Sequence, residues 1–162
     1  MPVPRRLSSD GGRQQMTAPE IGLNVRTILI DDSQSTREVL ARLVSFAGGR
    51  VVASYGSAEE ALRALEPADL VILDYQMPGM DGIAAAERIR AQDPHVFLAM
   101  ITVLDHPVIR DRAGRAGIRA FLGKPVSLAQ VGALMSLVHE RVSPEHVLAG
   151  DELIAWLLEE DA

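Results

Sequence analysis

Residues 70–82 read LVILDYQMPGMDG, an apolar run that ends at an acid and leads through a turn into a helix. Leu70–Leu73 is uninterrupted by polar residues, which is typical of a strand covered on both faces of a sheet. The Pro-Gly pair at 78–79 suits the central positions of a type II turn. Asp81 suits the N-cap of the following helix. The stretch predicts one strand-turn-helix unit with Asp74 at the carboxyl end of the strand.

The same unit repeats along the chain. Four further apolar runs resemble buried strands: Thr27–Ile30, Val51–Ser54, Phe97–Ile101 and Ala120–Leu122. Amphipathic stretches indicate the helices: Ser35–Ala47, Ser57–Leu65, Asp81–Gln92, Pro107–Ala116 and Ser127–Val142. Five strands that alternate with five helices predict an α/β fold with a parallel sheet and right-handed crossovers. Such sheets bind ligands beyond the carboxyl ends of their strands, so the functional residues are expected there.

Composition and charge limit the classes of function. The chain has 162 residues, of which 48% are hydrophobic and 23% charged, as in an ordinary globular domain with tails. It has no cysteine, which excludes disulfides and thiolate metal sites. The net charge of −6 argues against a dedicated nucleic-acid binder, and no apolar run is long enough for a membrane span. We therefore expect a cytoplasmic protein that binds neither nucleic acid nor membrane.

The two ends of the chain differ from its middle. Residues 1–25 are mostly polar and lack an apolar core, so we predict a flexible leader rather than a secretory signal, with Met16 as an alternative start. Residues 143–162 are expected to form a linker and an acidic amphipathic helix. Its apolar side chains are Leu153, Ile154, Leu157 and Leu158 on one face, with Trp156 beside them. Without the five acids between 151 and 162, the net charge would be −1.

The acidic helix has three arrangements open to it. It can pack back on the fifth helix, serve as an arm that binds a partner or a second copy, or remain disordered. Residues 127–138 contain no charged side chain, although the outer face of such a helix normally carries charge. We therefore expect a second subunit, a partner or the last segment of the chain to cover this helix.

Reactive side chains stand at the predicted strand ends. Asp31 and Asp32 follow the first strand, Asp74 follows the third, Thr102 ends the fourth, and Lys124 follows the fifth. Neighbouring carboxylates raise one another's pKa unless a cation offsets their repulsion, and oxygen ligands of this kind suit Mg²⁺. Thr102 can donate a hydrogen bond to a phosphoryl oxygen, and Lys124 can form an ion pair with another. Lys124 is the only lysine among sixteen basic residues, which favours a specific use of its ammonium group.

These motifs resemble the receiver domains of two-component response regulators, whose fold is a flavodoxin-like, doubly wound sheet of five parallel strands in the order 2-1-3-4-5. The matching segments are LIDDSQSTR at 29–37, LVILDYQMPGMDG at 70–82, MITV at 100–103 and AFLGKP at 120–125. The resemblance implies a receiver domain over 26–142, followed by an extra C-terminal helix. It also implies a stand-alone regulator rather than an enzyme, because little sequence follows the fifth helix.

The resemblance implies a metal-assisted phosphorylation site. Asp74 would accept the phosphoryl group from a sensor histidine kinase or a histidine phosphotransfer protein. Asp32 and Asp74 would ligate Mg²⁺ together with the backbone carbonyl of Gln76, and Asp31 would bind the ion through water. Phosphorylation would then control binding to a downstream protein. A phosphate sink or phosphorelay intermediate is the alternative within signalling.

The resemblance also implies a switch. Thr102 and Phe121 would be the paired switch residues. The alternative for Phe121 is an ordinary core or edge-strand aromatic, but Ala120 and Leu122 already supply the alternate face of the strand, which favours the switch. The helix at 107–116 contains glycine and β-branched residues, so it should be easily reshaped. Lys124–Pro125 would carry a cis peptide bond. A homodimer through the fourth helix, fifth strand and fifth helix, or through the C-terminal helix, is a further expectation.

Three positions bear on rival functions and on the lifetime of the phosphoryl group. Val103 is bulky and Leu104 cannot orient water, so we expect slow hydrolysis at Asp74. An aspartyl phosphatase would need an acid where Gln76 stands. A flavodoxin would need hydroxyl-rich loops and aromatic residues where this chain has three acids. Neither rival suits the sequence.

Overall fold

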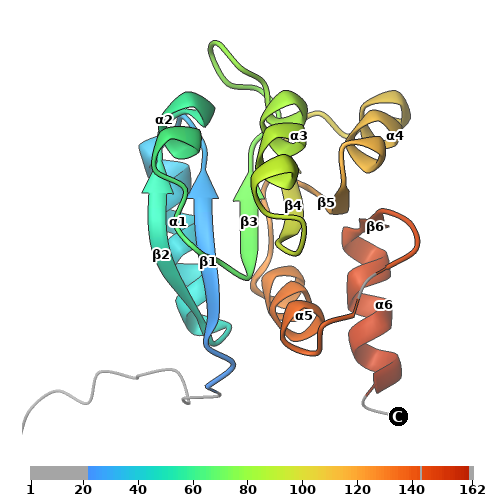
Figure 1. Ribbon diagram of the computed structural model, residues 1–162. Coiled ribbons are helices and arrows are strands. Elements are labelled where there is room, and N and C mark those ends of the chain that lie inside the picture. Colours follow the sequence, from blue (N-terminus) through green and yellow to red (C-terminus); the bar gives the residue numbers. More distant parts are fainter. Residues whose placement is uncertain (1–21, 143, 161–162) are drawn as a thin grey trace, which may run out of the picture.

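A parallel sheet of six strands forms the centre of the molecule (Figure 1). The computed structural model describes residues 22–142 and 144–160, so the predicted leader lies mostly outside the described residues. The strands are β1 Val25–Ile30, β2 Gly49–Tyr55, β3 Leu70–Leu73, β4 Phe97–Thr102, β5 Ile118–Gly123 and β6 Leu148–Ala149. Their order is β2-β1-β3-β4-β5-β6, and every pair is parallel. The predicted order 2-1-3-4-5 is confirmed, and β6 extends it.

Within the described part of the chain, six helices connect and follow the strands. They are α1 Gln34–Phe46, α2 Ala58–Arg63, α3 Gly82–Gln92, α4 Pro107–Arg115, α5 Leu128–His139 and α6 Gly150–Glu160. The N-caps expected from the sequence are present: the side chains of Ser57, Asp81 and Ser127 each accept a backbone N–H of the first turn. At α5 the Gln130 side chain also bonds back to the Ser127 backbone, which completes a capping box. The starting positions of α2, α3 and α5 therefore follow from the local sequence.

Two boundaries differ from the sequence-based expectation. The fifth helix ends at His139 instead of continuing to Val142, because Arg141 adopts a left-handed φ of 57° and breaks the helical path. The N–H of Val142 then bonds to the carbonyl of Leu137, as in a Schellman motif. Glycine usually occupies this position, so the arginine gave no signal. The two-residue strand β6 was also missed, because it is too short to show a period.

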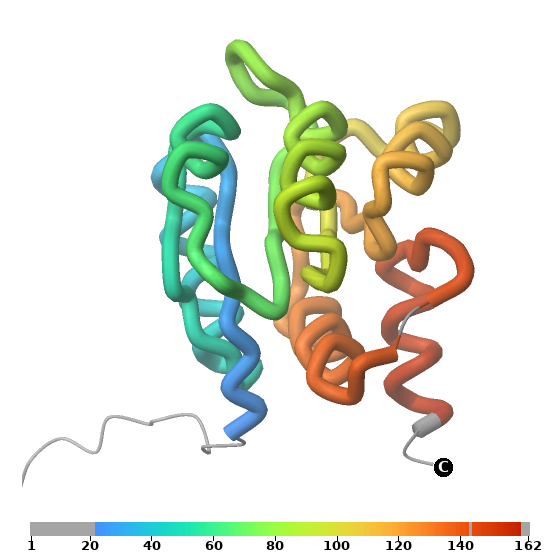
Figure 2. The backbone as a smooth tube through the Cα atoms, viewed as in Figure 1, coloured from blue at the N-terminus to red at the C-terminus, as the bar shows by residue number. Residues whose placement is uncertain are grey.

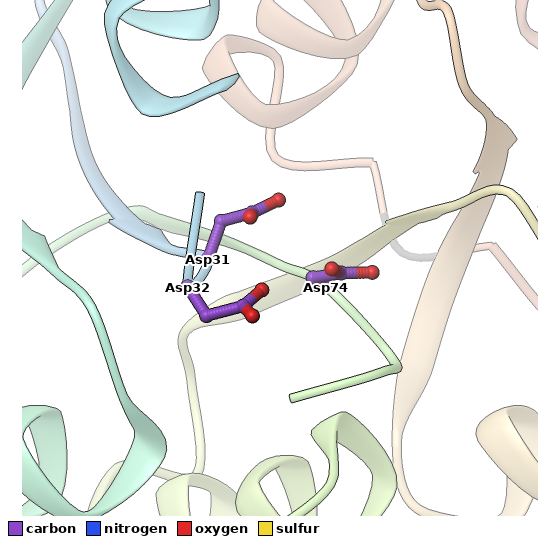
Figure 3. Close-up of side chains that lie close together, drawn as sticks. All are labelled: Asp31, Asp32 and Asp74. Atoms are coloured by element: carbon purple, nitrogen blue, oxygen red, sulfur yellow. The ribbon is translucent and has the colours of Figure 1, made fainter. Parts of the chain in front are cut away.

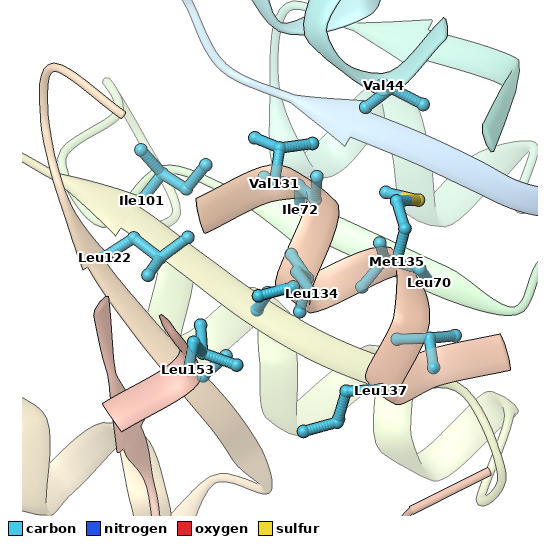
Figure 4. Close-up of a cluster of buried hydrophobic side chains, with 14 of the residues drawn as sticks. Val44, Leu70, Ile72, Ile101, Leu122, Val131, Leu134, Met135, Leu137 and Leu153 are labelled. Atoms are coloured by element: carbon cyan, nitrogen blue, oxygen red, sulfur yellow. The ribbon is translucent and has the colours of Figure 1, made fainter. Parts of the chain in front are cut away.

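Helices cover both faces of the sheet. One apolar cluster joins α1, α5 and α6 to strand residues that include Leu29, Ile72 and Leu122 (Figure 4). A second cluster joins α2, α3 and α4 to alternate strand residues, among them Ile30 and Phe121. This alternation within each strand gives the nearly continuous apolar runs seen in the sequence. Among the described residues, no helix combines the length and apolarity needed to cross a bilayer.

The C-terminal segment packs on the domain. It forms β6 at the free edge of β5 and then α6 alongside α5, as both backbone views show (Figures 1 and 2). Leu153 is 0% exposed, and Ile154, Trp156 and Leu157 pack against the same cluster. Leu158, expected on the same face, is 65% exposed, because it points away from α5 one residue beyond Leu157. The last segment thus covers the uncharged fifth helix, the first of the three arrangements considered.

Candidate functional site

The candidate site lies beyond the carboxyl ends of β1, β3, β4 and β5. Backbone hydrogen bonds continue past the ends of β1, β3 and β5 and fix the first residue of the loop after each of these strands. The Asp74 N–H donates to the carbonyl of Ile30 over 2.9 Å, and the Lys124 N–H donates to that of Thr102 over 2.9 Å. The strand ends therefore hold the reactive residues in register with one another.

Three carboxylates meet at this edge (Figure 3). One oxygen atom from each of Asp31, Asp32 and Asp74 lies within 4.8 Å of the others. Asp31 is 2% exposed and Asp74 is 7% exposed, whereas Asp32 is open to solvent. Oxygen ligands that are partly buried and open on one side suit a cation such as Mg²⁺, which retains several waters. The donor set therefore fits a divalent ion.

Lys124 joins two of these carboxylates. Its Nζ lies 2.8 Å from Oδ2 of Asp31 and 3.2 Å from Oδ2 of Asp74. The Lys124–Pro125 peptide bond that follows the strand is cis. One ammonium against three carboxylates leaves a formal charge of −2 in the cluster, which a divalent cation would neutralise.

Burial and neighbouring charge change the ionisation of the site. Burial raises the pKa of Asp74, the negative charge of Asp31 raises it further, and the positive charge of Lys124 opposes both. For Lys124, burial alone would lower the pKa, but the hydrogen bond and charge of Asp31, helped by Asp74, raise it overall. Lys124 is therefore cationic at neutral pH, and an ionised Asp74 is stabilised by any further cation.

Thr102 and Phe121 lie on the neighbouring strands β4 and β5. Thr102 is 0% exposed, and its hydroxyl accepts the N–H of Leu104 over 3.3 Å. Phe121 is buried against the cluster of α2, α3 and α4, and the guanidinium of Arg110 lies 5.6 Å from its ring centre. The structure thus places both predicted switch residues beside the site, one strand apart, and their switching remains a prediction.

The residues expected to govern hydrolysis lie in the loops that follow β3 and β4. Gln76 lies two residues beyond Asp74 with an exposed side chain, and its role as a carbonyl ligand remains a prediction. Val103 is 68% exposed, and Leu104 beside it is also exposed. Two exposed apolar side chains therefore follow the end of β4, and no charged residue occupies positions 76, 103 or 104.

Sequence reasoning missed three supports of the site. Arg37 donates from Nη1 to the backbone carbonyl of Asp31, and Glu59 accepts the N–H of Met80 over 2.9 Å. A Cβ added to Gly82 would lie 2.1 Å from the carbonyl oxygen of Asp74. Gly82 lies in the first turn of the helix expected at 81–92, and no sequence pattern reveals such a close backbone approach.

Comparison with known proteins agrees with this geometry. The family model of the response regulator receiver domain matches residues 27–136. The chain belongs to this family. The match contains every strand from β1 to β5 except the first two residues of β1, and it ends before β6 and α6. Its five matching strands and the helices between them form the flavodoxin-like fold of two-component receiver domains.

Individual relatives cover the same part of the chain. A cyclic di-GMP phosphodiesterase response regulator, RpfG of Xanthomonas campestris, is 34% identical over 122 residues, which are 72% of this chain and 32% of that protein. The signal receiver domain of the response regulator NarL from Mycobacterium tuberculosis is 28% identical, with a TM-score of 0.67, over 72% of this chain and 97% of that one. A chain of the CheX–CheY–BeF₃⁻–Mg²⁺ complex of Borrelia burgdorferi is 26% identical, with a TM-score of 0.64, over 70% and 87% respectively.

The chain spans only 27 to 54% of the length of the curated relatives described as cyclic di-GMP phosphodiesterases and as the response regulator MprA. The activities in those names therefore describe proteins of which the receiver domain is one part.

Proposed function

We propose that this receiver accepts a phosphoryl group on Asp74 and signals through a change in protein binding. The observation that carries the proposal is the convergence of Asp31, Asp74 and Lys124. The Lys124 ammonium lies 2.8 Å from one carboxylate and 3.2 Å from the other, within a cluster that fits a divalent ion. This arrangement combines a nucleophile with positive charge for a transferred phosphoryl group.

The proposed step is a phosphoryl transfer from a phosphohistidine. A carboxylate oxygen of Asp74 attacks phosphorus, the new P–O bond forms as the P–N bond breaks, and the electron pair returns to the imidazole of the donor. The Lys124 ammonium offsets charge on one phosphoryl oxygen, and the Thr102 hydroxyl donates a hydrogen bond to another. The donor is a sensor histidine kinase or a histidine phosphotransfer protein.

Mg²⁺ is the proposed cofactor of this step. Asp32, Asp74 and the carbonyl of Gln76 would hold it, with Asp31 bound through water. The ion would supply positive charge that neutralises the carboxylates and the phosphoryl oxygens. A structural neighbour supports this assignment, because its complex contains both BeF₃⁻ and Mg²⁺.

The proposal also includes the domain boundaries and the extent of catalysis. We assign 26–142 to the receiver domain, and we propose that no catalysis occurs beyond self-phosphorylation and slow hydrolysis. The exposed apolar pair Val103 and Leu104 supports slow hydrolysis, because neither side chain can orient an attacking water. Decay of the phosphorylated protein within seconds would contradict this part of the proposal.

The test is phosphorylation by a small donor. The protein is incubated with acetyl phosphate and Mg²⁺, and its intact mass is measured. Wild type should gain one phosphoryl group, whereas Asp74→Asn and the metal-free protein should gain none. Glu87→Gln is the control, because Glu87 is an exposed carboxylate of α3 that does not belong to the carboxylate cluster. Equal phosphorylation of wild type and Asp74→Asn would refute the assignment.

A further inference from the structure

Residues 147–160, which we call the strap, contact three elements of the receiver: β5, α5 and α4. Leu148 and Ala149 pair with Ala120 and Phe121 along the free edge of β5. Helix α6 packs on α5 and buries Leu153 completely. On the α4 side, a Cβ added to Gly114 would lie 2.8 Å from Cγ2 of Val147. The strap lies beyond the part of the chain that matches the receiver family.

The surface beneath the strap is built to be covered. Helix α5 buries Val131, Leu134, Met135 and Val138 at the spacing of one helical face, and it buries Ala133 and Leu137 in addition. A helix covered only by the sheet would bury side chains on one face. Burial of Ala133 and Leu137 as well therefore requires a second element packed against α5. Strand β5 likewise needs a partner for its outer edge. The strap meets both requirements.

A short path leads from Asp74 to the strap. Lys124, which contacts Asp74, directly follows the last residue of β5. One edge of β5 pairs with β4, and its other edge pairs with the strap. A polar cavity of about 420 Å³ lies on this path. Its lining includes the loop after β4, helix α4, strand β5, helix α5 and the strap: Asp105, Arg110, Phe121, Gln130, Gly150 and Asp151.

Arg110 connects the two ends of that cavity. Its guanidinium pairs with Asp105, three residues beyond Thr102, and lies over the ring of Phe121. Phe121 in turn pairs with Ala149 of the strap. A shift of Thr102 and Lys124 toward a phosphoryl group would therefore act on β5 and on the loop after β4, whose residues Phe121 and Asp105 are linked through Arg110 to the strap.

We propose that the strap is an intramolecular inhibitor, and that phosphorylation of Asp74 releases it and opens β5 and α5 to a partner protein. The proposal rests on the function proposed above. The partner carries a segment with the chemistry of the strap: a short strand that leads into an amphipathic helix with leucines on one face and acids on the other. The docked strap itself displays the complementarity that such a segment needs.

The chain contains its own reporter for release. Trp156 is its only tryptophan, and it lies partly buried against α5 and the neighbouring apolar cluster. With Mg²⁺ and beryllium fluoride, a mimic of the phosphoryl group, the Trp156 emission of the full chain should shift to longer wavelength. Asp74→Asn should show no shift. Leu153→Asp should be shifted without any mimic, whereas Leu158→Asp, at a position 65% exposed, should keep the wild-type spectrum.

Opening of the surface is measured separately with a labelled synthetic peptide of residues 144–162. Because apparent affinity falls in proportion to the fraction of open molecules, the mimic should strengthen binding of this peptide to the full chain about tenfold or more. Leu153→Asp should bind it equally well without the mimic. Circular dichroism establishes that this variant is folded.

A reversible lock keeps the test independent of Leu153→Asp. The native chain has no cysteine, so Gly114→Cys and Val147→Cys introduce a single pair at positions in contact. The oxidised pair should abolish both the emission shift and peptide binding, and reduction should restore them. Phosphoryl uptake without either response would overturn the strap alone. Failure of Asp74 to take up a phosphoryl group would overturn the proposed function and, with it, the trigger for release.

Discussion

Asp74 shares one ammonium group with Asp31, and this shortage of positive charge has consequences for stability. Burial raises the pKa of Asp74, so the ionised side chain is less favourable in the folded protein than in the unfolded chain. In the absence of metal, the site therefore costs folding free energy at neutral pH. The protein therefore keeps an unfavourable charge arrangement at the place where we propose that a cation and a phosphoryl group bind.

Asp74→Asn should consequently stabilise the metal-free protein. We expect the free energy of unfolding in EDTA to rise by about 1 kcal/mol, the usual scale of single substitutions. Mg²⁺ at a hundredfold excess over its Kd should add about 2.7 kcal/mol to wild type and much less to the variant. Urea denaturation of both proteins and of Glu87→Gln measures these differences. A variant less stable than wild type in EDTA would contradict the argument.

Asp69 shows the opposite electrostatic case at the other end of the sheet. Its Oδ1 lies 3.2 Å from Nη2 of Arg26, and its Oδ2 accepts the Arg26 backbone N–H over 2.9 Å. Burial alone would raise the pKa of Asp69, but the hydrogen bonds and charge of Arg26 lower it overall. A carboxylate with a lowered folded pKa stabilises the fold above the unfolded pKa and loses this effect as pH falls through the folded pKa.

Asp69→Asn should therefore lower stability in a pH-dependent way. Because the pair is well exposed, the loss at pH 7 should be below about 1 kcal/mol. The difference from wild type should shrink as pH falls below about 3.9, the ordinary pKa of aspartate. Urea denaturation from neutral to acid pH measures it. A difference that stays constant with pH would show that charge is not its cause.

At the scale of single residues, the sequence predicted the charged groups that converge at the sheet edge better than the groups that support them. Asp31, Asp74 and Lys124 were found because strand ends of a parallel sheet meet at one edge. Arg37 and Glu59 could not be predicted, because each forms a hydrogen bond with a backbone atom that only the folded chain brings near. Their side chains look like ordinary charges on a helix.

At the scale of elements, caps and turns determine where the functional loops begin. The loop from β3 to α3 is held by the N-cap Asp81, by Gly79 with a φ of 80°, and by the close contact at Gly82. The cap and the turn could be read from residue types. The contact could not, because it depends on how closely α3 approaches the end of β3.

Gly82→Ala tests that contact. Its Cβ would meet the carbonyl oxygen of Asp74 at 2.1 Å, so the loop must move. We expect a loss of about 1–3 kcal/mol in unfolding free energy and slower phosphorylation by acetyl phosphate. Gly132→Ala is the matched control, because a Cβ there meets nothing within 4 Å and the residue lies inside α5. This control should gain about 0.5–1 kcal/mol. Equal effects of the two changes would exclude the contact as the cause.

At the scale of the whole molecule, the alternation of five strands and five helices was enough to predict a parallel sheet, whereas its strand order came from the resemblance to receiver domains. The extension by β6 and α6 was only partly predictable. The uncharged stretch 127–138 indicated a cover over α5, and α6 provides it. Nothing in the sequence around Leu148 and Ala149 distinguished a strand from a linker, because pairing with β5 alone makes it one.

The central strands and the strap should differ in local stability. Strands β3 and β4 are flanked by strands on both sides and buried on both faces, whereas β6 pairs with a single strand over two residues. In hydrogen exchange measured by mass spectrometry, amides of β3 and β4 should exchange only on global unfolding. Amides of β6 and α6 should exchange through local unfolding of the strap, whose free energy should lie several kcal/mol below that of global unfolding. Equal protection of both regions would mean that the strap unfolds only with the domain.

The two residues of β6 also cover part of the outer edge of β5, where another chain could otherwise add a strand. While they remain in place, the outer N–H and C=O groups of β5 next to them are shielded from other chains. A row of such groups left open is a template for strand addition and, at high concentration, for aggregation. Each release of the strap would then expose the edge of β5 and make the molecule prone to aggregation. Rapid binding of the correct partner would cover this edge and keep the activated protein in solution.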